Sequence, residues 1–276
     1  MKKLTLAFLA LALAAAPLGL GCKKSHDAGT TMPGAGDTIT VPLAARTVGV
    51  RWTKTDDVST QLHVVQGDQS ADIGSKRHHV TASEILAVDG AGLITKVAVT
   101  YQERTDETVG NEPSPPSVLV GKSYVVSVEG GAVAATRADG SAVSAAELVE
   151  LTDDQDDLGK APVMEQLMAR TWKRGERVEL TADELQRYAA NKGAGPRATA
   201  MAFTLEGVAA GKATFAMTMT MTGDGDVAFD ITGKVVVDAA SGRPDQLQMH
   251  GPVSGMMGDA KVTGTLTGNV VYQFAN

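Results

Sequence analysis

The sequence predicts a mainly β protein, built as an antiparallel, strongly curved, half-barrel-like sheet with a short helical insert. Apolar and polar residues alternate with period two from Thr38 toward the middle of the chain, and again from Met201 to the C-terminus. Helical spacing occurs only between these two parts. Such a sheet needs cover for its apolar face, so we expect the helices on the concave side. Two separate β-domains are the alternative.

The first alternating part predicts several strands and one well-marked hairpin. Val48, Val50 and Trp52 alternate with polar or small residues. Asp89-Gly90 separates the apolar run 85–88 from the strand expected over 93–101, and Asp-Gly between such runs is a strong hairpin signal. A further strand is expected over 123–128, before two consecutive glycines.

The helical insert is expected at about residues 144–190. Leu148 and Leu151 are three residues apart, and apolar residues at helical spacing recur over 163–168. Thr181 and Glu184 form the pattern of a capping box before a third short helix. The acidic segment 152–157 is expected to lie between the first two helices.

The last part of the chain alternates most clearly and predicts a meander with one apolar and one wet face. One strand there carries large apolar side chains on one face and threonines on the other. After a turn at 223–226, the apolar residues return in phase at Val227, Phe229 and Ile231. The apolar side chains of the first strand are Phe215, Met217, Met219 and Met221.

The N-terminus has the parts of an export signal, which we assign to residues 1–21. Two lysines precede the apolar run Leu4–Leu13, which is shorter than the roughly 20 residues that a membrane-spanning helix needs. Cys22 follows, and it is the only cysteine in the chain. Residues 22–41 are expected to be the lipidated cysteine and a flexible tether, and 42–276 a single β-rich domain that contains the helical insert.

The stretch Leu18-Gly19-Leu20-Gly21-Cys22 resembles the lipobox of bacterial lipoproteins, although that family usually has Leu where Gly19 stands. The resemblance implies cleavage before Cys22 and acylation of its thiol. Several acyl chains anchor a protein stably, because each buried methylene contributes about 0.8 kcal/mol. Lys23 follows the cysteine in place of the aspartate that marks retention in the inner membrane. The resemblance therefore implies an anchor in the outer membrane, with the body in the periplasm.

The body of the chain also resembles a family, through segments 81–101 (TASEILAVDGAGLITKVAVTY) and 168–180 (MARTWKRGERVEL) and the closing meander. These look like uncharacterised bacterial envelope lipoproteins. Their general shape is loosely similar to that of periplasmic lipoprotein carriers with half-barrel folds. This resemblance implies the curved-sheet architecture and no particular activity.

Composition and incomplete motifs point away from nucleic-acid binding and catalysis. The net charge is −7 and aromatic residues make up only 4%, which disfavours phosphate backbones and base-stacking platforms. Gly121-Lys122-Ser123 lacks the earlier glycine of a phosphate-binding loop, since position 116 is proline. Ser254 lacks the preceding glycine of a nucleophile elbow and is expected in a turn. We therefore expect no enzyme activity and no cofactor.

Metal binding is also not expected. His78 and His79 are adjacent in a predicted strand, so their side chains should face opposite sides of the sheet. The acidic segment 152–157 has neither the glycine nor the glutamate of an EF-hand loop, so a solvated acidic loop is favoured over a weak calcium site.

The stripe formed by Met217, Met219 and Met221 allows two hypotheses. Methionine is flexible and suits surfaces that accept varied apolar partners, so the stripe is a candidate groove for a lipid or an acyl chain; ordinary core is the alternative. The first hypothesis for function is accordingly a non-catalytic lipoprotein that binds an apolar ligand or an envelope component. The second is a structural or protein-interaction lipoprotein of the envelope, without a small-molecule ligand.

Overall fold

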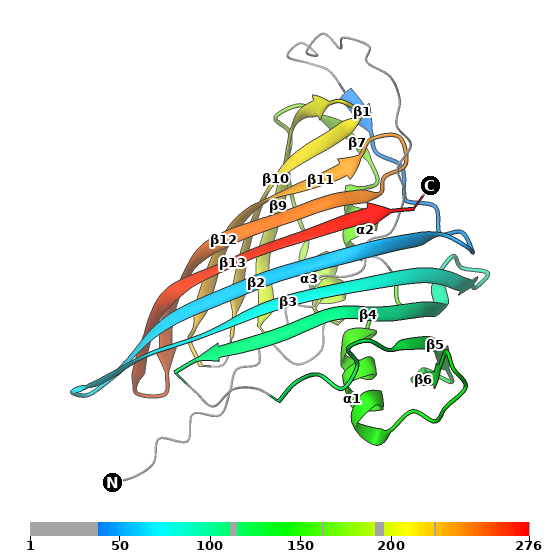
Figure 1. Cartoon of the computed structure of the whole chain (residues 1–276). Coiled ribbons are helices and arrows are strands. Elements are labelled where there is room, and N and C mark those ends of the chain that lie inside the picture. Colours follow the sequence, from blue (N-terminus) through cyan, green and yellow to red (C-terminus); the bar gives the residue numbers. More distant parts are fainter. Residues whose placement is uncertain (1–37, 111–114, 162, 191–195, 224, 276) are drawn as a thin grey trace.

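The computed structural model describes residues 38–110, 115–161, 163–190, 196–223 and 225–275. Within these ranges, the chain forms long strands and short helices (Figure 1). The strands are β1 (Thr38–Thr40), β2 (Arg51–Gln66), β3 (Gln69–Val88), β4 (Ile94–Val109), β5 (Ser123–Glu129), β6 (Ala132–Arg137), β7 (Thr171–Lys173), β8 (Arg177–Glu179), β9 (Arg197–Ala209), β10 (Lys212–Thr222), β11 (Ala228–Asp238), β12 (Pro244–Met257) and β13 (Ala260–Phe274). The helices are α1 (Ala145–Asp154), α2 (Val163–Met168) and α3 (Ala182–Ala190).

One open antiparallel sheet of 11 strands forms the body, in the order β6-β5-β4-β3-β2-β13-β12-β11-β10-β9-β8. Strand β2 pairs with β13, so the strands before and after the helical insert belong to the same sheet. The predicted fold class is thereby confirmed. Strands β6, β7 and β8 were not foreseen from the sequence.

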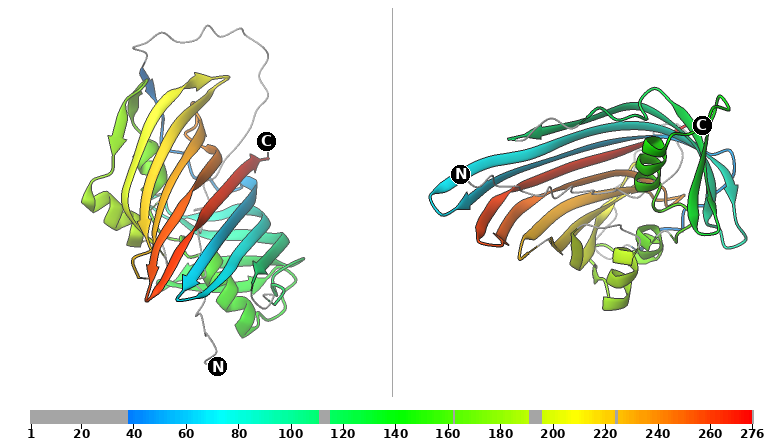
Figure 2. Two further views of the ribbon diagram at one scale, coloured as in Figure 1. Left: turned by 90° about the vertical axis from the view of Figure 1, so that its left-hand side faces the viewer. Right: turned by 90° about the horizontal axis from the view of Figure 1, so that it is seen from below.

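The sheet is strongly curved (Figure 2), and glycines in its central strands contribute to the bend. A Cβ atom on Gly251 would lie 2.0 Å from the backbone oxygen of Asp230, and one on Gly264 would lie 2.0 Å from the oxygen of Gln61. Only glycine permits such an approach of neighbouring strands. Glycine kinks of this kind and β-bulges are the devices by which sheets curve.

Side chains of the concave face pack into two apolar clusters. The methionine cluster lies on β9–β13 and is covered by residues of α2 and α3. The β4–β5 cluster is covered by α1 and contains Trp52, Tyr101, Tyr124 and Tyr272 but no methionine. Eight methionines belong to the first cluster or pack against it: Met164, Met168, Met201, Met217, Met219, Met221, Met249 and Met257. Both clusters have helices on the concave side, as predicted (Figure 2).

Two capping boxes start the longer helices. Ser144 and Glu147 cap α1, and Thr181 and Glu184 cap α3 as the sequence predicts. The expected loop at 152–157 is partly wrong, because α1 continues through Asp154. No helix in the described ranges has the length and apolar character needed to cross a membrane.

Glu147 fastens α1 to the sheet edge. Its buried carboxylate accepts hydrogen bonds from Arg137 at 2.7 Å, Tyr124 at 2.7 Å and Lys122 at 2.9 Å. The hydrogen bond from Arg137, followed by those from Tyr124, Ser144 and Lys122, holds the pKa of Glu147 far below its usual range. Lys122, which stands in the incomplete phosphate-loop motif, therefore serves as a structural contact.

Residues 38–41, placed in the tether by sequence analysis, belong to the ordered body. β1 pairs with β7, and Val41 is buried in the methionine cluster. Nearby, Arg46 donates a hydrogen bond to Glu165 of α2 at 3.0 Å. Burial raises the pKa of Glu165 to about 6. The folded chain therefore favours the protonated carboxyl of Glu165. The stability that this protonation contributes is lost as the pH rises from about 4.5 to about 6.

Candidate functional site

Cys22, the predicted lipidation site, lies outside the described residues, as do the predicted signal peptide and the tether up to residue 37. The anchor therefore stays a prediction. The sites that the structure describes belong to the folded body.

Met217, Met219 and Met221 share the concave face of β10, as the alternation predicts. Their exposed fractions are 3%, 6% and 4%, so all three are packed within the methionine cluster. Side chains of α2 and α3, among them Leu167 and Leu185, pack against the same cluster. The helical insert thus covers the face that carries the predicted stripe.

A row of alternating glycine and methionine crosses the sheet at Met217. Moving strand by strand, Met217 opposes Gly233, Gly233 opposes Met249, and Met249 opposes Gly268. Gly268 in turn opposes Val58 on β2. We call Gly268, Met249, Gly233 and Met217 the Gly–Met row. Sequence analysis found only Met217, because the row depends on the register of four strands.

Each methionine of the Gly–Met row lies over a glycine of the neighbouring strand. The Cγ and Cε atoms of Met249 are 2.9 and 3.2 Å from the place where a Cβ atom of Gly268 would stand. At Gly233, the corresponding place lies 2.2 Å from the backbone oxygen of Gln248 and 3.2 Å from the Cε atom of Met217. The floor under these two side chains is therefore bare backbone, and flexible methionines fill the space above it.

Beyond Val58, the concave face becomes charged. Six side chains of β2, β3 and β4 form what we call the charged strip: Lys54, Asp56, Arg77, His79, Arg104 and Asp106. Asp56 is only 4% exposed, and its Oδ2 atom lies 3.2 Å from Nη2 of Arg77 and 3.5 Å from Nζ of Lys54. Arg104 donates to Asp154 of α1 at 3.2 Å, so the strip also connects the sheet to that helix.

Asp106 shows how the charged strip is balanced. Burial alone would raise the pKa of the Asp106 carboxyl, but the hydrogen bond with His79 and the nearby cations Arg104 and Arg77 lower it on balance. The strip was missed in the sequence. Its only signal was the presence of Lys54 and Asp56 in phase with the apolar residues Trp52 and Val58.

Two buried polar atoms on β2 have no hydrogen-bond partner among the described residues: Oδ1 of Asp56 and Oγ1 of Thr60. The side chains of Asp56, Val58 and Thr60 follow one another on the concave face of β2. The two unpartnered atoms therefore flank the residue at which the Gly–Met row ends. Unpaired buried polar groups are unusual in folded proteins and call for an explanation.

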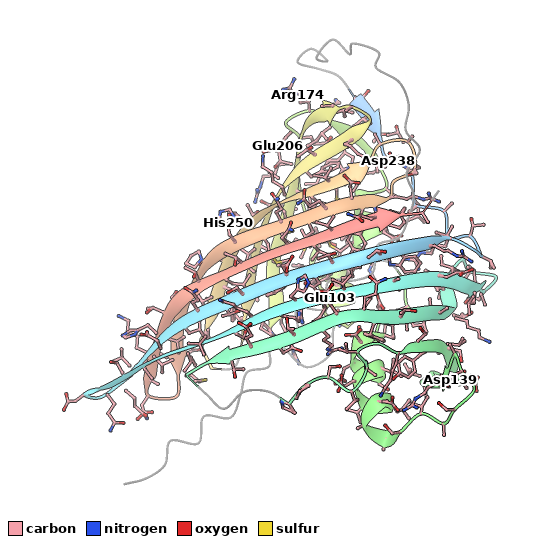
Figure 3. The ribbon with its side chains drawn as sticks, viewed as in Figure 1. Glu103, Asp139, Arg174, Glu206, Asp238 and His250 are labelled. Atoms are coloured by element: carbon pink, nitrogen blue, oxygen red, sulfur yellow. The ribbon has the colours of Figure 1, made fainter. Side chains whose placement is uncertain are left out.

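The adjacent histidines face opposite sides of the sheet, as predicted. His79 lies in the charged strip, 3.2 Å from Asp106, whereas His78 lies 2.6 Å from Asp57 and 3.3 Å from Glu103 on the other face. Figure 3 labels Glu103 on β4. The hydrogen bond with Asp57 raises the pKa of His78. Across the described ranges, no group of three His, Cys, Asp or Glu side chains is arranged to hold a metal ion.

A shallow hollow of about 360 Å³ lies where β2, β3 and β13 run together, near the β2–β3 hairpin. His63 and Asp72 line it and lie 2.7 Å apart. Ser254, which stands in the incomplete nucleophile-elbow motif, is exposed within β12 and does not lie in the expected turn.

No family model and no curated protein matches the chain. Among solved structures, one of lipovitellin that concerns its lipid–protein interactions is similar with a TM-score of 0.44 and 8% identity, covering 84% of this chain. This chain spans only 26% of that lipovitellin chain. DynF from the dynemicin biosynthesis pathway of Micromonospora chersina has a TM-score of 0.20 and 9% identity, with 90% of each chain covered.

The chain also has a weak structural similarity to the LolA superfamily protein NE2245 from Nitrosomonas europaea. The TM-score is 0.16 and the identity 10%, covering 79% of this chain and 84% of that protein. All three TM-scores lie below 0.5, so the similarities are too low to assign the chain to a family.

Proposed function

We propose that this chain is a non-catalytic, lipid-anchored protein of the outer membrane that binds an apolar ligand, such as an acyl chain, at its methionine cluster. The observation that carries the proposal is the Gly–Met row. Two flexible side chains lie there over bare backbone on the concave face of an open sheet. The ligand would take their place beneath α2 and α3.

The physical argument concerns the difference between the two clusters. Methionine has three rotatable side-chain bonds, so Met217 and Met249 can swing aside while the strands stay in place. The β4–β5 cluster is packed as an ordinary hydrophobic core, with branched and aromatic side chains and no methionine. The cover over the methionine cluster is also slight, because α2 has six residues and α3 has nine. Short helices of this size are marginal without tertiary contacts, which suits a cover that moves.

A second candidate function, a protein-interaction lipoprotein, is favoured by a different surface. Four apolar side chains around α1, namely Val118, Val120, Leu148 and Val149, are 37% to 62% exposed. Ser117 and the backbone of Val118 donate hydrogen bonds to Glu150 of α1, which brings the two segments together. Contiguous exposed apolar side chains often mark protein contacts.

The binding proposal predicts that the purified chain takes up a fluorescent fatty acid saturably at micromolar concentration. Replacing both Met217 and Met249 by leucine should weaken that affinity severalfold, because branched side chains move less easily off Gly233 and Gly268. Stability should change little, since Met→Leu conserves volume and usually costs under about 1.5 kcal/mol per site. Fluorescence titration and urea unfolding measure the two effects.

Met221→Leu is the matched control. Met221 lies on the same strand with 4% exposure, but it opposes Phe229 and not a glycine. Its replacement should leave the affinity unchanged. Absence of saturable binding by the unaltered chain would contradict the proposal and leave the protein-interaction function in its place.

The anchor gives a separate prediction. Cys22→Ser should release the chain from membranes or leave it unprocessed, because the thiol is the proposed acylation site. Fractionation followed by an alkaline wash measures this, with Lys23→Arg as a control that keeps the cysteine. Equal retention of Cys22→Ser and the unaltered chain in the membrane fraction would show that no lipid on Cys22 holds the protein there.

A further inference from the structure

The Gly–Met row has two different ends. At one end, Met217 opposes Phe203 of β9, which is buried and apolar. At the other end, Gly268 opposes Val58, beyond which lies the charged strip. From Val58 to Met217 the row makes four strand-to-strand steps of about 4.8 Å, roughly 19 Å in all. A long acyl chain laid along the row would therefore have one end in an apolar environment and one end beside charges.

At the polar end of the row, the side chains of Asp56 and Thr60 can each form a further hydrogen bond. Asp56 and Thr60 stand two residues before and after Val58 on the same face, about 6.6 Å away along the strand. Oδ1 of Asp56 and Oγ1 of Thr60 are buried and have no partner among the residues that the structure describes. Arg77 opposes Val58 on β3, which closes the third side of this position.

The chemistry of Asp56 decides what kind of group can form a hydrogen bond with its Oδ1 atom. An ionised carboxylate only accepts hydrogen bonds, and its Oδ2 atom already faces Arg77 and Lys54. The remaining Oδ1 atom therefore requires a donor. A free fatty acid at neutral pH presents a second carboxylate, which has no donor for Oδ1, so it can lie along the Gly–Met row without binding this atom. A hydroxyl or ammonium group supplies the donor.

We infer that the ligand is an amphiphile whose head carries hydroxyl or ammonium groups, and that this head lies over Val58, where Asp56 and Thr60 bind it. The inference rests on the proposed function and adds the class and the orientation of the ligand. The acyl chain follows the Gly–Met row toward Met217, and the head lies over Val58 beside Asp56 and Arg77 of the charged strip.

The test compares two neutral probes of equal chain length, a monoacylglycerol and the corresponding fatty-acid methyl ester. Each displaces a fluorescent fatty acid from the purified chain. The two probes differ in hydroxyl donors and not in charge. The monoacylglycerol should displace the reporter at an about tenfold lower concentration, the ratio that corresponds to one buried hydrogen bond to a charged group.

Three variants test which residues cause the preference for the monoacylglycerol over the methyl ester. Asp56→Asn can place an amide donor where Oδ1 stood, so the preference for the monoacylglycerol should fall toward one. Thr60→Val, which keeps the side-chain shape, should reduce the preference without weakening the methyl ester. Thr55→Val on the opposite face of β2 should change neither probe. If Asp56→Asn fails to fold, Thr60→Val carries the test by itself.

The outcomes separate the two claims. Equal displacement by both probes in the unaltered chain, with sensitivity to Met217→Leu and Met249→Leu, overturns the head assignment and leaves the apolar binding site. Preference for the monoacylglycerol that persists in Thr60→Val and Asp56→Asn also overturns the assignment to these residues. If no fluorescent fatty acid binds at all, both the proposed function and this inference fail.

Discussion

Phe229→Asp is expected to prevent folding of the whole sheet. Phe229 is 1% exposed within the methionine cluster, where it opposes Met221 on β10 and Val253 on β12. An unpaired carboxylate at this place would cost several kcal/mol, comparable with the total stability of a typical domain at about 5–15 kcal/mol. Far-ultraviolet circular dichroism during urea unfolding should show no cooperative transition for the variant.

Thr222→Asp is the control on the other face of the neighbouring strand. Thr222 is exposed and opposes Arg197 of β9, so a carboxylate there stays in water beside a cation. Thr220 is less suitable, because its hydroxyl already donates to Asp230 and a second carboxylate would repel it. The free energy of unfolding of Thr222→Asp should differ from that of the unaltered chain by no more than about 0.5 kcal/mol, as is usual for surface changes. Equal losses in both variants would mean that the two faces of the sheet are assigned wrongly.

Gly264→Ala is expected to have the second largest effect. The added Cβ atom would lie 2.0 Å from the oxygen of Gln61 and 2.8 Å from Cα of Leu62, both in the backbone of β2. Backbone cannot rotate aside as a side chain can, so β2 and β13 must separate at the centre of the sheet. We expect a loss of about 3 kcal/mol, at the upper end of ordinary overpacking costs. Urea unfolding at equilibrium measures it.

Gly268→Ala on the same strand is the matched comparison. The three atoms nearest to its Cβ atom would all be side-chain atoms of Met249, the closest at 2.9 Å. Met249 can move, and alanine also restricts the unfolded chain, so the net change should be close to zero. A large loss in Gly268→Ala would show that Met249 is rigid, which contradicts the binding proposal as well as this comparison.

The sequence was most informative where one face of a strand is uniformly apolar. On β10 and β11, alternation places Met217 and Phe229 on the buried face, and the structure confirms both. The capping box at Thr181 likewise locates the start of α3, because a cap is a local feature of a few residues.

The remaining features depend on contacts between distant segments. Lys54 and Asp56 occupy concave positions of β2, where their charges interrupt the alternation that would otherwise identify a long strand. Arg77, which pairs with Asp56, lies on β3 and becomes visible only once the register is known. The same holds for Met249 over Gly268. A sequence shows which residues alternate, but the pairing of strands decides which of them meet.

The pairing of β2 with β13 has a consequence for how the chain folds. Trp52 pairs with Phe274, and the register continues to Val65 opposite Lys261, so this seam joins the most distant strands of the main sheet. The hairpins on either side have local contacts and can form early, whereas the seam requires closure of a very long loop. Contacts of such high sequence separation slow folding. We therefore expect two half-sheets to form early and the pairing of β2 with β13 to be the slow, late step of folding.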